Sequence, residues 1–392
     1  MKIPFEKYGV SLYRQGKACE GYTLITPYSL QNNVWLMDMR GNYVHRWVIP
    51  GPPRNHAVLL PNGHLLCAIA GPLPPESDMS YPRIGSWATS AGLIELDWES
   101  NEVWKYVDRY QSHTFYRMTN GNTMIPRITR VPDELASKLR RGLPGTEDRG
   151  MIWTDGFREV NPEGKIVWEW DMADHLDPEV HVLCPICYRG DYTHMNSCEV
   201  LPDGNVLTSF RNIDTICIVD KTTGKIKWQW GPGEISHQHT PTLLENGNIL
   251  LFDNGAHRRN GQLLTYSRAL EVNPFTNKIE WVYKGNPLQS FYSSLISGCQ
   301  RLPNGNTLIC EGIKGRVFEV TMDGEIVWEF VNPFYAPHGV PGETGASTWK
   351  RSYALFRAYR YTSDYPGLKG KDFYPKKLDW VNRLYRPKVL EN

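Results

Sequence analysis

The feature that most constrains the fold is a phrase that recurs six times along the chain. An apolar strand, a short turn with Gly or Asn and a second strand ending near a tryptophan follow one another, as in VWLMDMRGNYVHRW and ICIVDKTTGKIKWQW. Units that repeat at a spacing of roughly 50–60 residues indicate an array of similar supersecondary units. The marker tryptophans are Trp47, Trp104, Trp168, Trp228, Trp281 and Trp328.

A second phrase follows five of these six units. AVLLPNGHLLCAI, EVLPDGNVLTSF and CQRLPNGNTLIC each place Asn-Gly or Asp-Gly between two apolar runs. This dipeptide favours a tight hairpin, because both central residues of the turn need a positive φ. Each unit therefore contains two hairpins, or four strands, which is the content of one propeller blade. We predict an all-β, six-bladed β-propeller.

The sixth unit has no hairpin after its tryptophan strand. We expect GYTLITPY, residues 21–28, to supply the missing strand, so that an N-terminal strand closes the last blade and covers its exposed edge. The propeller is predicted to span residues 1–331, with long loop inserts at 71–90, 127–152 and 171–193. PDELASKLRRG in the second insert predicts a short helix. Residues 332–392 are expected to pack on the propeller, with SYALFRAYRY helical.

Charge and hydropathy exclude several classes of partner. The formal net charge of +1 gives no broad basic face for nucleic acid. No run of apolar residues is long enough to cross a membrane, and the first residues lack the apolar core of a secretion signal. We therefore expect a cytoplasmic protein that binds neither nucleic acid nor membranes, with its eight cysteines reduced. The aromatic residues of the tail are compatible with a homodimer.

Polar residues recur at one position of the repeat. When the hairpins are aligned on their turn glycines, the position eight residues earlier is polar in all five: Asn55, His113, Asn196, His239 and Ser297. Two residues further upstream, on the same strand face by the period of two, lie His194 and His237. Because the innermost strand of every blade lines the central channel, these side chains are expected to converge on one axial site.

One stretch resembles a known family. DYTHMNSCEVLPDGNVLTSFRNIDTICIVDKTTGKIKWQWG, followed by HQHTPTLLENGNILLFDNG, is similar to the bacterial arylsulfate sulfotransferases. The resemblance implies a six-bladed propeller and sulfuryl transfer between phenols through a covalent histidine. It places the family motifs on His194 with Asn196 and Ser197, on Arg211, and on Gln238-His239 before Phe252-Asp253-Asn254-Gly255. For the third family histidine, His113 matches best by register and His56 is second.

The resemblance implies a role for each of these residues. His239 would be the nucleophile, while Arg211, His194 and His113 would stabilise charge on the sulfuryl oxygens and the leaving phenolate. The substrate would be a small aromatic compound, and no cofactor is required. The well-understood family members are exported and carry an extra N-terminal domain, so we expect a divergent cytoplasmic member. The expected substrate-binding residues are Asn196, Tyr192, His56, Asn55, Ser297 and Tyr292.

Two other functions stay open on the sequence. A divalent transition metal held by His113, His194, His237 and His239 would support a lyase, isomerase or hydratase. A propeller can also be a binding module without catalysis. Cys184 and Cys187 form a single Cys-X-X-Cys, which we interpret as a loop with two reduced thiols, with zinc or redox chemistry as the alternative. The sequence leaves the donor, the acceptor and the role of these cysteines undetermined.

Overall fold

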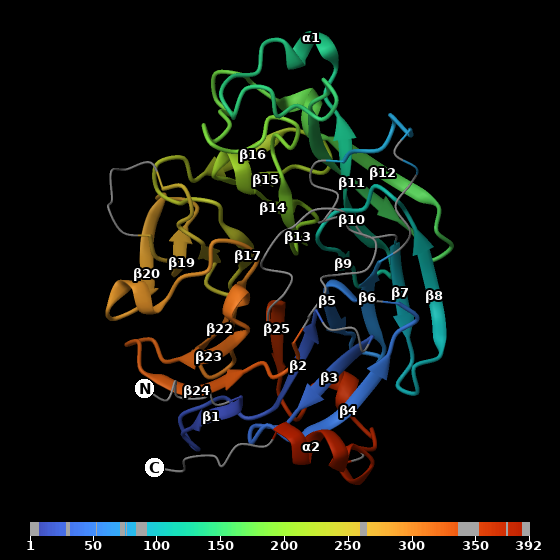
Figure 1. Ribbon diagram of the computed structural model, residues 1–392, viewed down its shortest axis with the longest axis vertical. Coiled ribbons are helices and arrows are strands. Elements are labelled where there is room, and N and C mark those ends of the chain that lie inside the picture. Colours follow the sequence, from blue (N-terminus) through green and yellow to red (C-terminus); the bar gives the residue numbers. More distant parts are fainter. Residues whose placement is uncertain are drawn as a thin grey trace. The chain divides into compact units, whose positions relative to one another are not determined.

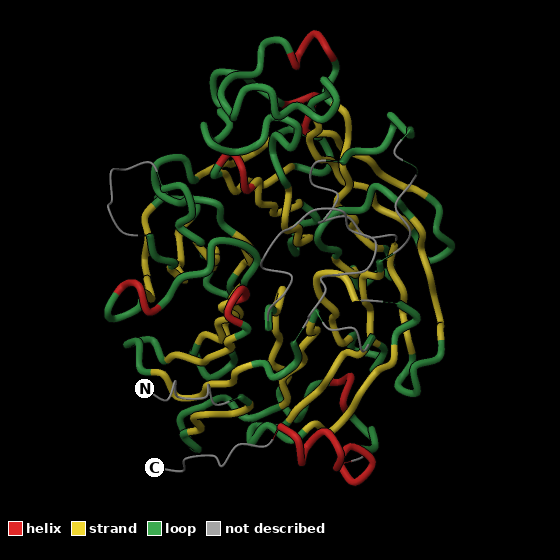
Figure 2. The backbone as a smooth tube through the Cα atoms, in the orientation of Figure 1, coloured by secondary structure: helices red, strands yellow, loops and turns green. Residues whose placement is uncertain are grey.

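The computed structural model describes residues 8–28, 32–51, 53–70, 75, 77–83, 92–258, 265–335, 353–373 and 375–385. The chain is a six-bladed β-propeller, as the repeat predicts. Its strands form six antiparallel sheets of four strands, one of which gains a fifth (Figure 1). Strands and loops make up nearly all of the drawn chain, and helices are confined to short segments (Figure 2).

The chain divides into two compact units. Unit 1 comprises Met1–Ala70, Leu93–Lys105 and Ile296–Asn392, and unit 2 comprises Gly71–Gly92 and Tyr106–Leu295. Unit 2 holds three complete sheets, each built from four strands that follow one another in sequence. These are β9 (Tyr116–Arg117), β10 (Thr123–Arg130), β11 (Trp153–Val160) and β12 (Ile166–Asp171); β13 (Met195–Val200), β14 (Val206–Phe210), β15 (Thr215–Val219) and β16 (Ile226–Trp230); and β17 (His239–Leu243), β18 (Ile249–Asp253), β19 (Arg268–Asn273) and β20 (Lys278–Lys284).

The other three sheets belong to unit 1, apart from end residues of β7 and β8. Their strand orders are β5-β6-β7-β8, β25-β2-β3-β4 and β1-β24-β23-β22-β21. The strands are β1 (Gly9–Tyr13), β2 (Tyr22–Pro27), β3 (Asn33–Met37), β4 (Tyr43–Val48), β5 (Pro53–Leu59), β6 (Leu65–Ile69), β7 (Gly92–Leu96), β8 (Glu102–Val107), β21 (Gly298–Arg301), β22 (Thr307–Glu311), β23 (Arg316–Val320), β24 (Ile326–Val331) and β25 (Leu355–Tyr361).

The closure of the propeller differs from the prediction. The segment at 21–28 does not join the last blade: β2 pairs with β3 on one side and with β25 on the other. SYALFRAYRY is therefore not helical but supplies the strand β25. An N-terminal strand does reach the last blade, but it is β1, added beyond β24 as a fifth strand. The first blade needs a fourth strand because β2 would otherwise expose an unpaired edge.

A buried ion pair fixes β25 in place. The Arg360 guanidinium and the Glu319 carboxylate lie 3.3 Å apart, and neither side chain is exposed to solvent. Arg360 Nε also donates to Thr23 Oγ1 of β2 at 2.8 Å. A charge in the interior is stable only when its partners are present. The Arg-rich sequence of this strand thus matches specific acceptors in unit 1, which explains why it folds as a strand.

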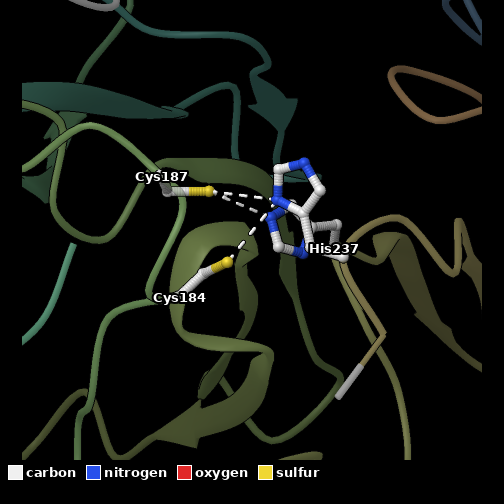
Figure 3. Close-up of side chains that lie close together, drawn as sticks. Cys184, Cys187 and His237 are labelled. Atoms are coloured by element: carbon white, nitrogen blue, oxygen red, sulfur yellow. Dashed lines mark hydrogen bonds between the residues drawn. The ribbon is translucent and has the colours of Figure 1, made fainter. Parts of the chain in front are cut away.

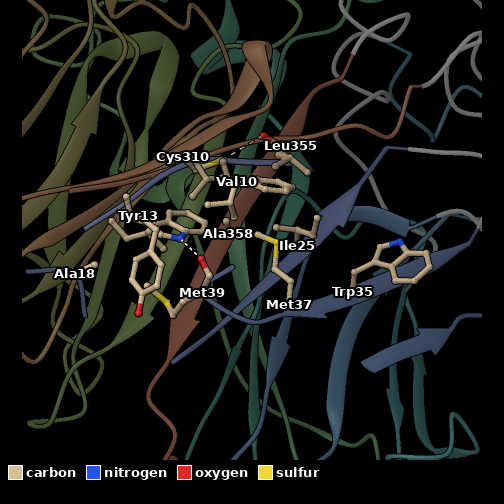
Figure 4. Packing of buried hydrophobic residues seen from close by; sticks show 14 of the residues in the cluster. Val10, Tyr13, Ala18, Ile25, Trp35, Met37, Met39, Cys310, Leu355 and Ala358 are labelled. Carbon is tan, nitrogen blue, oxygen red and sulfur yellow. Dashed lines mark hydrogen bonds between the residues drawn. The ribbon is translucent and has the colours of Figure 1, made fainter. Parts of the chain in front are cut away.

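A large apolar cluster packs the sheets of unit 1 together. Trp35 of β3, Trp328 of β24 and Phe330 of β24 are fully buried in it. Figure 4 shows Val10, Ile25, Leu355 and Ala358 meeting in this cluster, so β1, β2 and β25 contribute to one core. The cluster joins strands from both ends of the sequence, which secures the closure described above.

The C-terminal segment also contacts the first blade. Helix α2 (Asp379–Tyr385) places Asn382 beside β4, where its Oδ1 accepts from the Tyr43 backbone N–H at 2.8 Å. Trp380 meets Trp35 edge-on at 6.4 Å between ring centroids. In the second insert, the predicted helix is confirmed as α1 (Asp133–Ala136). None of the helices in the described ranges has the length and hydrophobicity needed to span a bilayer.

His45 of β4 makes folding stability depend on pH. Its ring is buried between Trp98 and Trp47, with centroid distances of 3.8 and 4.2 Å. Burial lowers its pKa to about 4. Below about pH 6.5, His45 therefore binds a proton in the unfolded chain but stays neutral in the folded chain. The contribution of buried His45 to the unfolding free energy is complete above that pH and is lost as the pH falls towards 4.

We expect the wild type to lose about 2 kcal/mol of unfolding free energy through His45 between roughly pH 7 and pH 5. His45→Phe keeps an aromatic ring and cannot titrate. The variant should therefore lose about 2 kcal/mol less unfolding free energy than the wild type over the same pH interval. Urea denaturation at the two pH values measures both losses. Equal losses in the two proteins would contradict this role for His45.

Candidate functional site

The aligned polar positions all lie within three residues of the start of a strand: β5, β9, β13, β17 or β21. Each is at most 3% exposed. A β-bulge interrupts the pairing of β5, β13 and β17 at or next to this position. Bulges turn a side chain away from the regular alternation of a strand. Three of the five residues, His113, Asn196 and His239, lie in unit 2; Asn55 and Ser297 lie in unit 1.

Two predicted histidines meet in unit 2. The rings of His113 and His194 pack edge to face, with centroids 4.5 Å apart. Ser112 Oγ is 2.6 Å from His113 Nδ1, and His194 Nδ1 is hydrogen-bonded to the Asp191 carboxyl. Burial, followed by the charge of Arg211, holds the pKa of His194 well below its usual value. His194 is therefore a neutral imidazole near pH 7, with Nδ1–H donating to Asp191.

Arg211 lies beside these histidines. It begins the 3-10 helix η3 (Arg211–Ile213) directly after β14, and its backbone N–H donates to the His194 carbonyl at 3.0 Å. Its Nη1 donates to Asn212 Oδ1 at 2.8 Å, and Asn212 Nδ2 donates to the Asp191 carbonyl at 2.6 Å. Burial raises the pKa of Asp191 to about 7, and the Arg211 charge opposes that rise. The guanidinium is thus a buried cation held by short-range contacts.

His239 has a defined tautomer. Its Nδ1 is 2.7 Å from Asn254 Oδ1. The Asn254 amide cannot be reversed without losing a contact, because its Nδ2 donates to the Ser293 carbonyl at 2.7 Å. An amide oxygen only accepts, so Nδ1 of His239 carries a proton, and in the neutral ring Nε2 carries the lone pair. This is the form of imidazole that can attack an electrophile.

Contacts between neighbouring sheets bring His239 towards the other residues. Asn196 Nδ2, at the bulge of β13, donates to the Gln238 carbonyl at 2.8 Å, directly before His239. Arg211 Nη2 donates to the Ser294 carbonyl at 3.4 Å, next to the carbonyl that orients Asn254. We call the set of His113, His194, Arg211 and His239 the histidine site.

His237 does not share the face of His239. Both His237 and Thr240 have positive φ, 60° and 56°, so the chain around His239 is not regularly extended and the period of two fails. His237 Nε2 lies 3.2 Å from Cys187 Sγ. The four-histidine metal set predicted from alternation is therefore not assembled, since His237 points to the cysteines while His239 points to Asn254.

Two cysteines and two histidines form a separate group. The ligand atoms of Cys184, Cys187, His237 and His257 all lie within 4.8 Å of one another, and Figure 3 shows both sulfurs directed at imidazole nitrogens. We call this group the thiol–imidazole cluster. The hydrogen bond between the two sulfurs lowers the pKa of Cys184 and raises the pKa of Cys187, so one thiolate is favoured here.

The other predicted substrate-binding residues are placed differently. Tyr192 is fully buried, and its hydroxyl donates to the His181 carbonyl at 3.0 Å, so its side chain packs within the fold and does not face a substrate as predicted. Tyr292 is half-buried beside the Phe291 ring, which packs on Phe252. In unit 1, His56 is buried and stacks on Phe356 at 5.9 Å.

The remaining two predicted residues make buried hydrogen bonds in unit 1. Asn55 Oδ1 accepts from the Tyr28 hydroxyl at 3.2 Å. Ser297 Oγ accepts from the Gly312 backbone N–H at 3.0 Å. Both contacts satisfy buried polar groups and hold local backbone, so their expected role toward substrate stays a prediction.

Comparison with known proteins identifies the family of the chain. Residues 88–333, well over half of the chain, match the model of the arylsulfotransferase (ASST) family. The chain belongs to the arylsulfotransferase family. No curated protein matches it. The family model spans all of the histidine site, including the motif residues His194, Arg211 and His239.

Among solved structures, several are similar to this arylsulfotransferase-family chain at low sequence identity. A protein of unknown function from Bacteroides caccae is 12% identical over 86% of this chain and 98% of its own, with a TM-score of 0.52. The hydrazine synthase of Kuenenia stuttgartiensis is 13% identical over 79% of this chain and 80% of its own, with a TM-score of 0.45. A streptogramin B lyase is 11% identical over 84% and 85%, with a TM-score of 0.43.

The contacts of three residues were not predicted from the sequence: those of Asp191 and Asn254 at the histidine site, and those of His257 in the thiol–imidazole cluster. Asp191 lies only three residues before His194 but in an insert without periodic pattern. The resemblance places Asn254 in a family motif, but its contact with His239 comes from the pairing of β17 with β18. His257 follows β18 with no motif spacing to the cysteines. The one signal for Asn254 in the sequence is its place directly after β18, the strand that pairs with His239.

Proposed function

We propose that this arylsulfotransferase-family chain transfers a sulfuryl group from an aryl sulfate to a phenol, with His239 carrying the group between them. The observation that supports this most is the tautomer of His239. Its Nδ1–H donates to Asn254, so Nε2 keeps a lone pair with which to attack sulfur. A covalent histidine splits one difficult transfer into two easier ones.

The two half-reactions balance. In the first, the Nε2 lone pair of His239 forms an N–S bond while the S–O bond to the donor breaks, and the electron pair leaves on the phenolate oxygen. In the second, the oxygen of the acceptor phenol forms an S–O bond while the N–S bond breaks and its electrons return to Nε2. The proton that the acceptor loses balances the one that the departing phenolate takes up. No cofactor is needed.

Arg211, His194 and His113 would stabilise the charge that develops during transfer. Arg211 is buried, so its guanidinium acts on the sulfuryl oxygens with little screening by water. His194 is neutral and anchored by Asp191, so it can act as a fixed dipole without adding a second full cation beside Arg211. As in phosphoryl transfer, positioning and charge would supply most of the catalysis.

The substrates we propose are small and aromatic. The leaving group must be stable as an anion, which phenols provide and aliphatic alcohols do not. Asn196, at the bulge next to Gln238, and the half-buried Tyr292 remain the candidates for contact with the ring or its oxygen.

The proposal is tested by the intact mass of the purified protein after incubation with 4-nitrophenyl sulfate. We expect a gain of about 80 Da, one sulfuryl group, together with release of nitrophenolate in a burst. Adding a phenol acceptor should remove the adduct. The absence of both adduct and phenolate at high donor concentration would overturn the proposed chemistry.

Asn254→Leu should lower kcat by roughly 100-fold and leave KM for the aryl sulfate nearly unchanged, because the proton on Nδ1 of His239 loses its acceptor. Asn254→Asp keeps an acceptor oxygen and should retain more activity than the leucine variant. Steady-state kinetics of the two variants separates these outcomes. Full activity in Asn254→Leu would show that tautomer control is not needed.

Arg211→Lys should lower kcat by roughly 100-fold. The ammonium group of lysine keeps the charge but does not replace the planar guanidinium of Arg211 with its several N–H donors. Arg158→Lys is the matched control, because it keeps the charge at a partly exposed ion pair between Arg158 of β11 and Glu169 of β12. The comparison requires turnover of both variants under the same conditions. Equal activities would remove Arg211 from the proposed reaction.

A further inference from the structure

The thiol–imidazole cluster draws its members from three separate segments of unit 2. Cys184 and Cys187 lie in the insert before β13, His237 precedes β17, and His257 follows β18. The cysteines and His237 are buried and His257 is exposed. Two soft sulfur ligands with two imidazoles form a donor set typical of a tetrahedral zinc centre.

The distances fit such a centre. Cys187 Sγ is 3.2 Å from His237 Nε2, and His257 Nδ1 is 3.5 Å from each of the two sulfurs. With Zn–S bonds of about 2.3 Å and Zn–N bonds of about 2.0 Å, the edges of a tetrahedron measure roughly 3.3–3.8 Å. The side chains thus already stand at about the separations that one ion would impose.

The surroundings of His237 select the nitrogen that faces the sulfurs. Its Nδ1 lies 3.1 Å from Asp214 Oδ1, and the Asp214 carboxylate also accepts the His237 backbone N–H at 2.9 Å. The two acceptors next to Nδ1, Asp214 Oδ1 and Ser236 Oγ at 3.3 Å, favour a proton on Nδ1. This leaves Nε2 as a lone-pair donor toward Cys187. A carboxylate that orients the second nitrogen of a ligand histidine is the usual outer shell of a zinc site.

Backbone contacts hold the cysteine loop in place without a disulfide. Both thiols are free. The Cys187 N–H donates to the Cys184 carbonyl at 3.2 Å, and the Cys184 N–H donates to the Asn212 carbonyl at 2.9 Å. The turn thus presents both sulfurs on the same side, toward the imidazoles. Without a counterion, two thiolates at this buried place would repel each other, which a dication would offset.

We propose that Cys184, Cys187, His237 and His257 bind one Zn²⁺ ion as a structural site. The four protein ligands fill a tetrahedral shell and leave no position for substrate, so the ion would hold the insert against β17 and β18 and take no part in the chemistry. The metal lyase considered from the sequence used His113, His194, His237 and His239, so the two ligand sets share only His237. This inference does not depend on the proposed sulfuryl transfer.

The test uses the full chain purified in reducing buffer without added metal. Metal analysis should find about one zinc per chain, and Co²⁺ exchanged into the protein should give a thiolate-to-cobalt charge-transfer band and the visible bands of a tetrahedral ion. Cys184→Ser and Cys187→Ser should lose the band and most of the zinc. His257→Gln changes an exposed ligand and should fold while binding zinc at least tenfold more weakly.

Matched controls separate ligation from general disturbance. Cys198→Ser replaces another buried thiol, and His175→Gln another histidine of the same insert; both should keep wild-type zinc content. The proposal is overturned if the reduced wild type holds no zinc and shows no cobalt charge-transfer band. It is also overturned if Cys184 and Cys187 form a disulfide in the purified protein, or if His257→Gln and the cysteine variants bind zinc as tightly as the controls.

Discussion

His239→Ala is expected to abolish both the sulfuryl adduct and turnover, with kcat lowered by about 1,000-fold or more. The reason is that Nε2 of His239 is the atom proposed to bond to sulfur, and alanine offers no replacement. The measurement combines intact mass, phenolate release and thermal unfolding of the variant. An unchanged unfolding temperature would show that the loss is chemical.

Variants of the neighbouring histidines distinguish nucleophile from support. His194→Ala and His113→Ala should slow formation of the adduct but not prevent it, because each would supply a donor and not the bonding atom. If a variant of His194 were never labelled while His239→Ala were, the roles would be exchanged. Near-normal activity in His239→Ala and His194→Ala together would show that the histidine site is not catalytic.

Loss of the zinc ion is expected to have the largest effect on stability. When the free zinc concentration is about 1,000 times the dissociation constant, binding adds about 4 kcal/mol to the unfolding free energy. Loss of the ion then lowers the melting temperature by an amount of the order of 10 °C. Cys184→Ser should show this fall in the presence of zinc, whereas Cys198→Ser should show much less.

The same change should reach the histidine site indirectly. The Cys184 backbone N–H donates to the carbonyl of Asn212, whose side chain contacts both Arg211 and the Asp191 carbonyl. A loosened cysteine loop would therefore disturb the cation and the partner of His194. Differential scanning calorimetry with and without chelator, together with turnover, checks both effects. A melting temperature unaffected by chelation and by Cys184→Ser would contradict a structural role for the ion.

The repeat in the sequence was enough to predict the fold, because tryptophan strands and Asn-Gly hairpins encode local structure. The same alignment found the buried positions of Asn55, His113, Asn196, His239 and Ser297. It could not place His237, since a positive φ breaks the period of two on which the prediction rested. The two-residue alternation along a strand does not predict the direction of a side chain at a bulge or at a residue with positive φ.

Long-range pairings were beyond the reach of the sequence. The sequence predicts a helix for strand β25 because its alternation is obscured by Arg360, whose partners Glu319 and Thr23 lie on other strands. His257 lies 70 residues after Cys187 with no spacing motif, so only the folded chain brings it to the cysteines. In both cases the deciding interaction is a contact of tertiary structure, which residue pattern alone does not encode.

The pairing of β2 with β25 also sets an order for biosynthesis. Residues 22–27 leave the ribosome early, yet their partner strand, residues 355–361, emerges after more than three hundred further residues. Until then the first blade has an open edge that could pair with another nascent chain. The ring can close only late in translation, so we expect the half-built protein to depend on chaperones and premature stops before residue 355 to yield aggregating fragments.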